Sequence, residues 1–476
     1  MGCVPLLNTD ELLRVPAAFE NGLRQAKRWP RSAVAALPGI SRHMPVVAYS
    51  MADQALAVGG GFLVNIVLAR TQTKEEYGMF ALSYSVFTFL LGLYYAAILE
   101  PCTVYGSGRY RHLFSEYLRL IVRCNAVVGV SLTGILLLAC LSLSWVVPHS
   151  MLRPFLGLAL TAAVLLSGYL LRRLFYVQRR PDLAAKSSLV FFIAVCAGLW
   201  FLGKMHQIDN FTVFLVLALG WIAAGAACGR KLQFGRPIRP FLALEPQYRR
   251  EHWKYMKWVL ATAFVFQFTH QGYYWLVGEF LSAREVADLR AMYLLVAPVE
   301  QVFIALSYLM VPALSAHYAA KRMGAFLSLW KRYTLITVGL SSVYALGVRI
   351  AGKTAVHILY AGKYDGLAPY LFVLALAPLL LWIGSTMGHA LNAAEKPTFL
   401  FWAYVSSAAA TLLVGIPLVL YLGLWGAVYG MLLSSATYTL ALSLSFSRTF
   451  RSVGRGRIQY VGEAIAVKPM TDRRVQ

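Results

Sequence analysis

The chain has 476 residues, of which 59% are hydrophobic and only 13% are charged. Its mean hydropathy of +0.61 excludes a soluble protein of ordinary composition. A formal net charge of +24 is compatible with nucleic-acid binding, but in so apolar a chain it is more simply explained by basic loops on one side of a membrane. The six cysteines form no C-x-x-C pair, so the sequence indicates neither a zinc site nor a disulfide framework.

Long apolar runs recur along the whole chain. A helix needs about 20 residues to cross a hydrocarbon core that is about 30 Å thick, and in lipid its backbone must be hydrogen-bonded internally. Twelve runs meet this length: Val46–Ala69, Gly78–Leu99, Leu120–Val147, Phe155–Tyr176, Leu183–Leu202, Phe211–Gly229, Trp258–Leu281, Leu289–Ser315, Phe326–Ile350, Tyr370–Leu391, Phe399–Tyr421 and Leu424–Phe446. The sequence therefore predicts an all-α polytopic membrane protein with about twelve transmembrane helices.

Lys and Arg are concentrated in alternate connections between these runs. By the positive-inside rule, this pattern places both termini in the cytoplasm. The predicted organisation is a basic cytoplasmic leader (1–45), a six-helix lobe (46–229), a cytoplasmic inter-lobe loop (230–257), a second six-helix lobe (258–446) and a basic cytoplasmic tail (447–476). Charge spread over short loops faces anionic headgroups, so no nucleic-acid partner is expected.

The second half of the chain repeats the first. The hairpin at Thr73 recurs at Ser282, the proline Pro101 recurs as Pro312, and Pro181 recurs as Pro397, with offsets of 209, 211 and 216 residues. Because a repeat of six spans is even, the two copies have the same orientation and are related by an axis along the membrane normal. We expect two pseudo-symmetric lobes around a central cleft, with the substrate between them.

The opening stretch contains DQALAVGGGFLVNIVLAR, then KEEYGMFAL, and its second run closes with ILEP. It resembles the start of bacterial polysaccharide flippases, the Wzx-type transporters of O-antigen and exopolysaccharide repeat units. These belong to the multidrug/oligosaccharidyl-lipid/polysaccharide exporter superfamily. The resemblance implies that the first, second, seventh and eighth runs line the central cleft.

Polar side chains lie in three of these four runs, namely Asp53, Gln54, Gln267, His270, Gln271, Glu300 and Gln301. Polar groups within a span usually face a bundle interior or a wet cavity, so we predict that they line the substrate cavity; the alternative is ordinary hydrogen bonding between helices. Asp53 has two candidate roles, binding a coupling H+ or Na+ ion or hydrogen-bonding sugar hydroxyls. Multidrug exporters of the superfamily resemble this chain in carrying an acid in the first span, which supports coupling. Pro298 is expected to break the eighth run.

Charged residues at the two ends of the spans suggest further roles. Arg70 and Glu279 are equivalent by the 209-residue offset, which predicts a periplasmic gate between them. On the cytoplasmic side, four arginines are candidates to attract the diphosphate of a lipid-linked sugar, because arginine binds phosphate in a bidentate manner: Arg109, Arg111, Arg172 and Arg173. The alternative for each is ordinary positive-inside anchoring.

Three functions remain compatible with the sequence. The first is a flippase that carries undecaprenyl-diphosphate-linked oligosaccharide from the cytoplasmic to the periplasmic leaflet by alternating access, with or without H+ or Na+ coupling. The second is a multidrug or small-molecule cation antiporter of the same fold, and the third is a membrane enzyme of polysaccharide assembly. The predicted periplasmic loops are short and hold no catalytic constellation, so the chain is not expected to be an enzyme. No cofactor or metal is expected; the expected partners are the lipid-linked oligosaccharide, membrane lipids and a polysaccharide polymerase complex.

Overall fold

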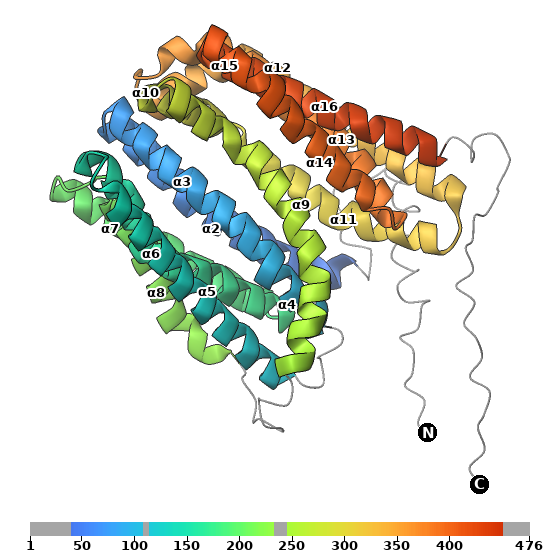
Figure 1. Ribbon diagram of the computed structural model, residues 1–476. Coiled ribbons are helices and arrows are strands. Elements are labelled where there is room, and N and C mark those ends of the chain that lie inside the picture. Colours follow the sequence, from blue (N-terminus) through green and yellow to red (C-terminus); the bar gives the residue numbers. More distant parts are fainter. Residues whose placement is uncertain (1–39, 108–113, 233–244, 451–476) are drawn as a thin grey trace.

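The computed structural model describes residues 40–107, 114–232 and 245–450, and every regular element in these ranges is a helix (Figure 1). The first half contains α2 (Ile40–Thr71), α3 (Lys74–Tyr94), α4 (Glu100–Ser107), α5 (Phe114–Leu143), α6 (His149–Val177), α7 (Pro181–Lys204) and α8 (Thr212–Cys228). The second half contains α9 (Glu245–Phe280), α10 (Ala283–Tyr293), α11 (Ala297–Ala319), α12 (Met323–Tyr360), α13 (Ala368–Ala393), α14 (Thr398–Ala410), α15 (Ile416–Leu422) and α16 (Leu424–Phe450). The predicted all-α membrane fold is confirmed.

Within the described ranges, eleven helical stretches are long and apolar enough to cross a membrane, which makes the chain a multi-pass membrane protein. The predicted seventh span, Trp258–Leu281, falls on α9, which ends at Phe280, and is not among these eleven. With 36 residues α9 is long enough to span a bilayer, but it carries the polar residues Gln267, His270 and Gln271. Its length thus suits a span, whereas its composition suits a helix that lies between other helices.

Three helix boundaries differ from the sequence prediction. The predicted inter-lobe loop 230–257 is helical from Glu245 onward, because α9 begins there. The predicted eighth span is divided into α10 and α11 by a turn at residues 294–296, as expected next to Pro298, which lacks a backbone N–H and clashes with the preceding turn. Helix α12 continues to Tyr360, ten residues beyond its predicted end.

The repeat predicted from the sequence is visible at equivalent helix ends. Thr73 caps the N-terminus of α3, and Ser282 caps the N-terminus of α10 in the second half. Pro101 follows a π-helical turn that connects α3 to α4, whereas Pro312 lies inside α11. Proline removes a backbone hydrogen bond from a helix, and a π-helical turn is one way in which a helix accommodates this loss.

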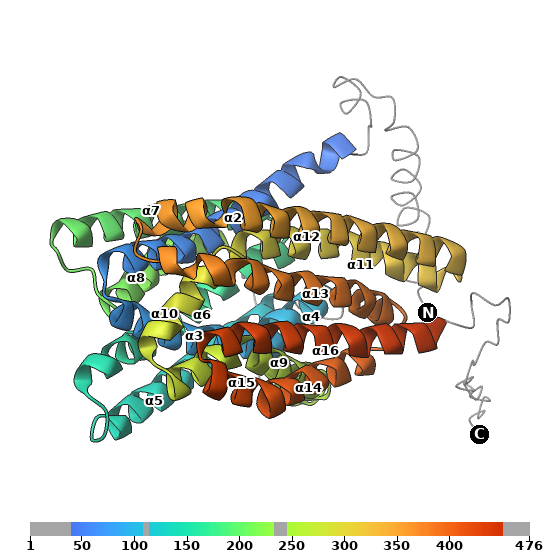
Figure 2. The same cartoon turned by 90° about the horizontal axis from the view of Figure 1, so that it is seen from above.

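The two halves meet mainly where α3 packs against α9 and α10 (Figures 1 and 2). We call the end of the bundle with the α2–α3 and α9–α10 connections the hairpin end, and the opposite end, where α2 begins and α16 ends, the terminal end. At the hairpin end one hydrophobic core runs through both halves and includes Val64, Phe80, Val277 and Ala287. Near the terminal end the second half has a separate core around Phe326 and Leu442. The halves are therefore joined at the hairpin end.

Candidate functional site: polar groups between the two halves

Asp53 is completely buried in the first half, at the centre of a hydrogen-bonded cluster. Arg172 of α6 donates from Nε to Oδ1 at 2.9 Å and from Nη2 to Oδ2 at 2.7 Å. The hydroxyls of Tyr176 and Ser188 donate to the same carboxylate at 2.8 and 2.5 Å. A bidentate arginine and two hydroxyls saturate the acceptor sites of a carboxylate, so this cluster needs no further ligand.

This cluster joins two residues to which the sequence assigns separate roles. Asp53 is a candidate for the cavity wall or for ion coupling, and Arg172 is a candidate for binding diphosphate. Both are buried, with Arg172 only 7% exposed, and both pair within one half of the molecule. In this conformation each group satisfies the other.

The neighbouring residue Gln54 connects the first half to the second. Its amide oxygen accepts a hydrogen bond from Arg172 Nη2 at 3.0 Å, and its Nε2 donates to Gln301 Oε1 of α11 at 2.9 Å. Both glutamines are half-buried. Gln54 therefore carries a polar connection from the buried ion pair to the opposite half.

The three predicted polar residues of α9 lie in different surroundings. Gln267 packs against Gly92 of α3, so closely that a Cβ on this glycine would lie 1.8 Å from the glutamine Nε2. The His270 ring lies against Phe266 in a tilted arrangement, with ring centroids 4.2 Å apart. The side-chain oxygen of Gln271 is buried and has no hydrogen-bond partner in the part of the chain that the structure describes. Of the three, Gln267 contacts the opposite half, and Gln271 has an unused acceptor.

Glu300 lies just after the break between α10 and α11 and accepts a hydrogen bond from the hydroxyl of Tyr293, which lies just before it. Both residues are half-buried. Discontinuous helices at the interface of two repeats commonly form substrate or ion sites in transporters. The break predicted from Pro298 thus places a carboxylate and a tyrosine at such an interface.

Arg290 of α10 is not among the residues identified from the sequence. Its Nε donates to Asn65 Oδ1 of α2 at 2.9 Å, across the two halves, and its guanidinium lies over the rings of Tyr84 and Tyr274, 4.8 and 5.9 Å from their centroids. Within the described ranges no carboxylate forms an ion pair with it. Tyr274 is 3% exposed, and its hydroxyl interacts with the Arg290 guanidinium.

A signal for Arg290 is present in the sequence. It is the second residue of the predicted eighth span, Leu289–Ser315, and a charge at a span end is readily assigned to the adjacent loop. Only the packing of α10 against α3 shows that this position faces the other half. Among the predicted arginines, Arg173 is half-buried and lies 5.5 Å from the Tyr95 ring centroid, whereas Arg109 and Arg111 lie outside the described residues.

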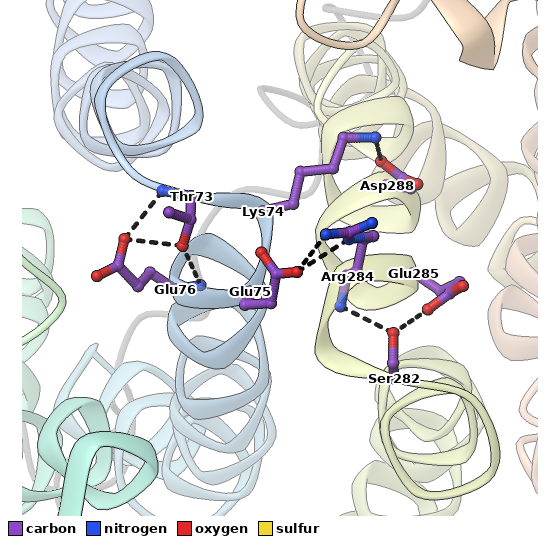
Figure 3. A network of polar contacts seen from close by, with 8 residues as sticks. All are labelled: Thr73, Lys74, Glu75, Glu76, Ser282, Arg284, Glu285 and Asp288. Atoms are coloured by element: carbon purple, nitrogen blue, oxygen red, sulfur yellow. Dashed lines mark hydrogen bonds and ion pairs between the residues drawn. The ribbon is translucent and has the colours of Figure 1, made fainter.

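Two ion pairs connect the halves at the hairpin end (Figure 3). Arg284 of α10 donates to Glu75 of α3, and Lys74 lies 2.7 Å from Asp288. Glu75 and Arg284 are 209 residues apart, the offset of the repeat. Residues at equivalent positions of two repeats lie next to each other when they are close to the pseudo-twofold axis. Glu75 and Arg284 are such a pair, and their opposite charges attract. The Gly78 backbone also touches this site, because a Cβ on Gly78 would lie 1.7 Å from the Ala283 carbonyl oxygen.

The predicted Arg70–Glu279 pair is not formed among the described residues. Arg70 instead donates from Nε to the Leu359 carbonyl at 2.7 Å and from Nη2 to the Ile358 carbonyl at 2.5 Å, both in the last turn of α12. The 209-residue offset does bring equivalent residues together, but it does so on α3 and α10. These helices pack together, whereas α2 and α9 do not pack extensively against each other.

No group of His, Cys, Asp and Glu side chains in the described ranges could hold a metal ion.

Burial and the nearby charge of Lys74 lower the pKa of Lys363, which lies in the connection between α12 and α13. This lysine still donates hydrogen bonds to the carbonyls of Ala69 and Gln72, the first at 3.0 Å. The hairpin end thus holds several cations that bridge the halves.

Solved structures share this arrangement of helices. The chain superimposes on an inward-facing multidrug resistance MATE family transporter of the MOP superfamily with a TM-score of 0.69 and 11% identity, covering 85% of this chain and 96% of that one. For the lipid II flippase MurJ in an inward closed conformation the TM-score is 0.66 at 11% identity, covering 84% and 87%. For a point mutant of the Vibrio cholerae MATE transporter VcmN it is 0.58 at 13% identity, covering 85% and 98%.

The chain has the fold of the MOP-superfamily transporters. No protein-family profile matches its sequence, and no curated protein matches it. The structural neighbours named here are multidrug resistance or MATE transporters and a lipid II flippase. At identities this low, the likeness establishes the fold and leaves the substrate to be argued from the residues of this chain.

Proposed function

We propose that the protein flips lipid-linked oligosaccharides, with an undecaprenyl diphosphate carrier, between the leaflets of the bacterial inner membrane by alternating access. The observation that carries the proposal is Arg290, a cation held between the two halves without a carboxylate partner in the described ranges. Arg290 is half-buried, and in the described ranges it contacts neutral groups directly while the Glu300 carboxylate acts on it only from a greater distance. A charge that is partly removed from water is costly unless it is paired. An anionic substrate group supplies the missing partner.

The surroundings of Arg290 suit a diphosphate followed by a sugar. The planar guanidinium binds phosphate oxygens through two parallel hydrogen bonds. The Gln271 side-chain oxygen is buried and accepts no hydrogen bond from the residues that the structure describes, and an amide oxygen can accept from a hydroxyl-rich ligand. The tyrosine rings add flat surfaces of the kind on which sugars stack.

The positive charge of Arg290 also argues against an organic cation as the substrate. A positive charge near Arg290 would be repelled, and the buried acid Asp53 is already paired with Arg172. Glu300 is the remaining carboxylate among the predicted cavity residues, and Tyr293 engages it. The cation-antiporter alternative therefore depends on Glu300 alone.

Binding measured with the full chain in nanodiscs tests the proposal. Undecaprenyl diphosphate carrying an oligosaccharide should bind to the wild type, and Arg290→Gln should weaken binding by about 10- to 100-fold, the range for a hydrogen bond to a charged group. Arg290→Lys should recover only part of the affinity because it lacks the planar fork. The matched control is Arg349→Gln, at an exposed position on α12.

Two results would contradict the proposal. One is equal affinity of the wild type and Arg290→Gln for the diphosphate lipid. The other is tight binding of a lipophilic cation that Glu300→Gln abolishes, which would favour the antiporter. In cells, a deletion strain should accumulate complete repeat units on the cytoplasmic leaflet, and the wild-type gene, but not the Arg290→Gln variant, should clear them.

A further inference from the structure

At the hairpin end, each half of the protein caps a helix that belongs to the other half. Arg70, at the end of α2, donates two hydrogen bonds to carbonyls in the last turn of α12. Lys363, just after α12, donates to the carbonyl of Ala69 in the last turn of α2 and to the carbonyl of Gln72, which directly follows α2. The two helices therefore exchange their C-terminal caps.

The last four carbonyls of a helix have no partner within the helix, and they form the negative end of its dipole. A cation placed there satisfies these carbonyls and stabilises the helix end. In an isolated half of this protein, neither Arg70 nor Lys363 could cap its present helix, because cap and helix end come from different halves. The stabilisation exists only while the halves are in contact.

We propose that this exchange of caps is the lock that holds the hairpin end closed. Opening that end requires both cations to leave the carbonyls of the opposite half, so the two sets of bonds break together. The lock follows from the contacts in the closed state and does not depend on which substrate is carried. It goes beyond the proposed function by identifying what controls access at this end.

The ion pairs at the same end are weaker candidates for the lock. Arg284 and Glu75 have side-chain exposures of 62% and 54%, and exposed pairs contribute little because water and salt screen them. Lys74 and Asp288 are more buried, at 27% and 13%, yet their attraction is offset by the cost of their own desolvation. The Arg70 hydrogen bonds are also exposed, whereas those of Lys363 are half-buried. The caps differ from the ion pairs because they satisfy backbone carbonyls, which have no partner within their own helix.

The rate at which a buried cysteine reacts with a maleimide tests the lock, because this rate is proportional to the population of the open state. Ala287 of α10 is fully buried in the core that both halves share, and Ala287→Cys is a small change. The experiment uses the ligand-free full chain in nanodiscs with the native cysteines replaced, except Cys228. That residue is 3% exposed in the last turn of α8 and reports general unfolding.

Arg70→Met and Lys363→Met should each raise the labelling rate at position 287 by about two- to fivefold, as expected for one charge at a helix end. The double variant should raise it by about tenfold, with the Cys228 rate unchanged. Arg349→Met and Lys353→Met are matched controls at exposed positions of α12 and should have no effect. Arg70→Lys and Lys363→Arg keep the cations and should stay close to the wild-type rate.

Each other outcome overturns the proposal. Rates equal to those of the α12 controls would show that the caps do not hold the end closed. An increase in the labelling rate at position 287 for only one of the two variants would show that the two caps do not act together. A parallel increase at Cys228 would show that the variants loosen the whole fold. Because no lipid-linked oligosaccharide is present, failure here is distinguishable from failure of the Arg290 binding experiment.

Discussion

The two halves of this protein share one helical plan but stabilise their interiors with different chemistry. In the first half, Asp53 and Arg172 form a buried ion pair that hydroxyls complete. In the second half, the corresponding packing of α9 against α14 and α16 is held by neutral groups. The Tyr273 hydroxyl lies 3.0 Å from Ser434 Oγ, which in turn lies 2.8 Å from Thr411 Oγ1.

This difference shows how a repeated fold can diverge in charge while it keeps its geometry. The offset of 209 residues places a threonine, Thr262, where the first half has Asp53. A buried ion pair is fixed in place because each partner alone would be an uncompensated charge, whereas hydroxyl networks tolerate the loss of one member. We therefore expect the first half to be the less tolerant of substitution.

Removal of Asp53 should have the largest effect on stability. Asp53→Ala leaves the Arg172 guanidinium buried without its partner, which should lower the free energy of unfolding by about 3–5 kcal/mol. Thermal or denaturant unfolding in detergent micelles measures the change. The double variant Asp53→Leu/Arg172→Met should recover most of the loss, since it removes both charges. A loss below about 1 kcal/mol for Asp53→Ala would remove the contrast between the halves.

A methyl group at Gly78 should separate the halves at the hairpin end. Gly78→Ala places a carbon 1.7 Å from the Ala283 carbonyl oxygen, and overpacking of this kind costs about 1–3 kcal/mol. The variant should raise the labelling rate of Ala287→Cys more than either cap variant does. Gly347→Ala in α12 is the control, because nothing lies within 4 Å of an added Cβ there. An unchanged labelling rate would show that the contact can be relieved by a small local shift.

The smallest effect is expected for the hydroxyl network of the second half. Tyr273→Phe removes the hydrogen bond to Ser434 and should destabilise the fold by about 0.5–1.5 kcal/mol, measured as for Asp53→Ala. The aromatic ring still packs between Gly415 and Gly430, so the packing of this ring should be unchanged. Tyr421→Phe, at an 87% exposed position, is the control. A loss as large as that of Asp53→Ala would mean that the neutral network is as critical as the ion pair.

Much of the fold could be predicted from local features of the sequence. The length of the apolar runs predicts the helices, and Pro298 predicts the break between α10 and α11. The apolar pattern does not predict the start of α9, because Glu245–Lys257 is too polar to be recognised as part of a span and yet continues the same helix.

The candidate site could be predicted only in part, because its contacts join residues that are far apart in the chain. Asp53, Gln54, Glu300 and Gln301 are recognisable as polar groups within spans. That Asp53 pairs with Arg172 depends on α7 packing beside α2 and α6 packing against α7, which no local signal specifies.

The sequence by itself determined that this is a helical, twofold-repeated membrane protein, because hydrophobic length and periodicity act along the chain. Only the tertiary structure decided which charges meet. It paired Glu75 with Arg284, placed Arg290 between the halves without a carboxylate partner in the described ranges, and set Arg70 on the end of α12. The physical reason is that electrostatic partners are selected by distance in space, and at an interface between two lobes that distance depends on how the lobes dock.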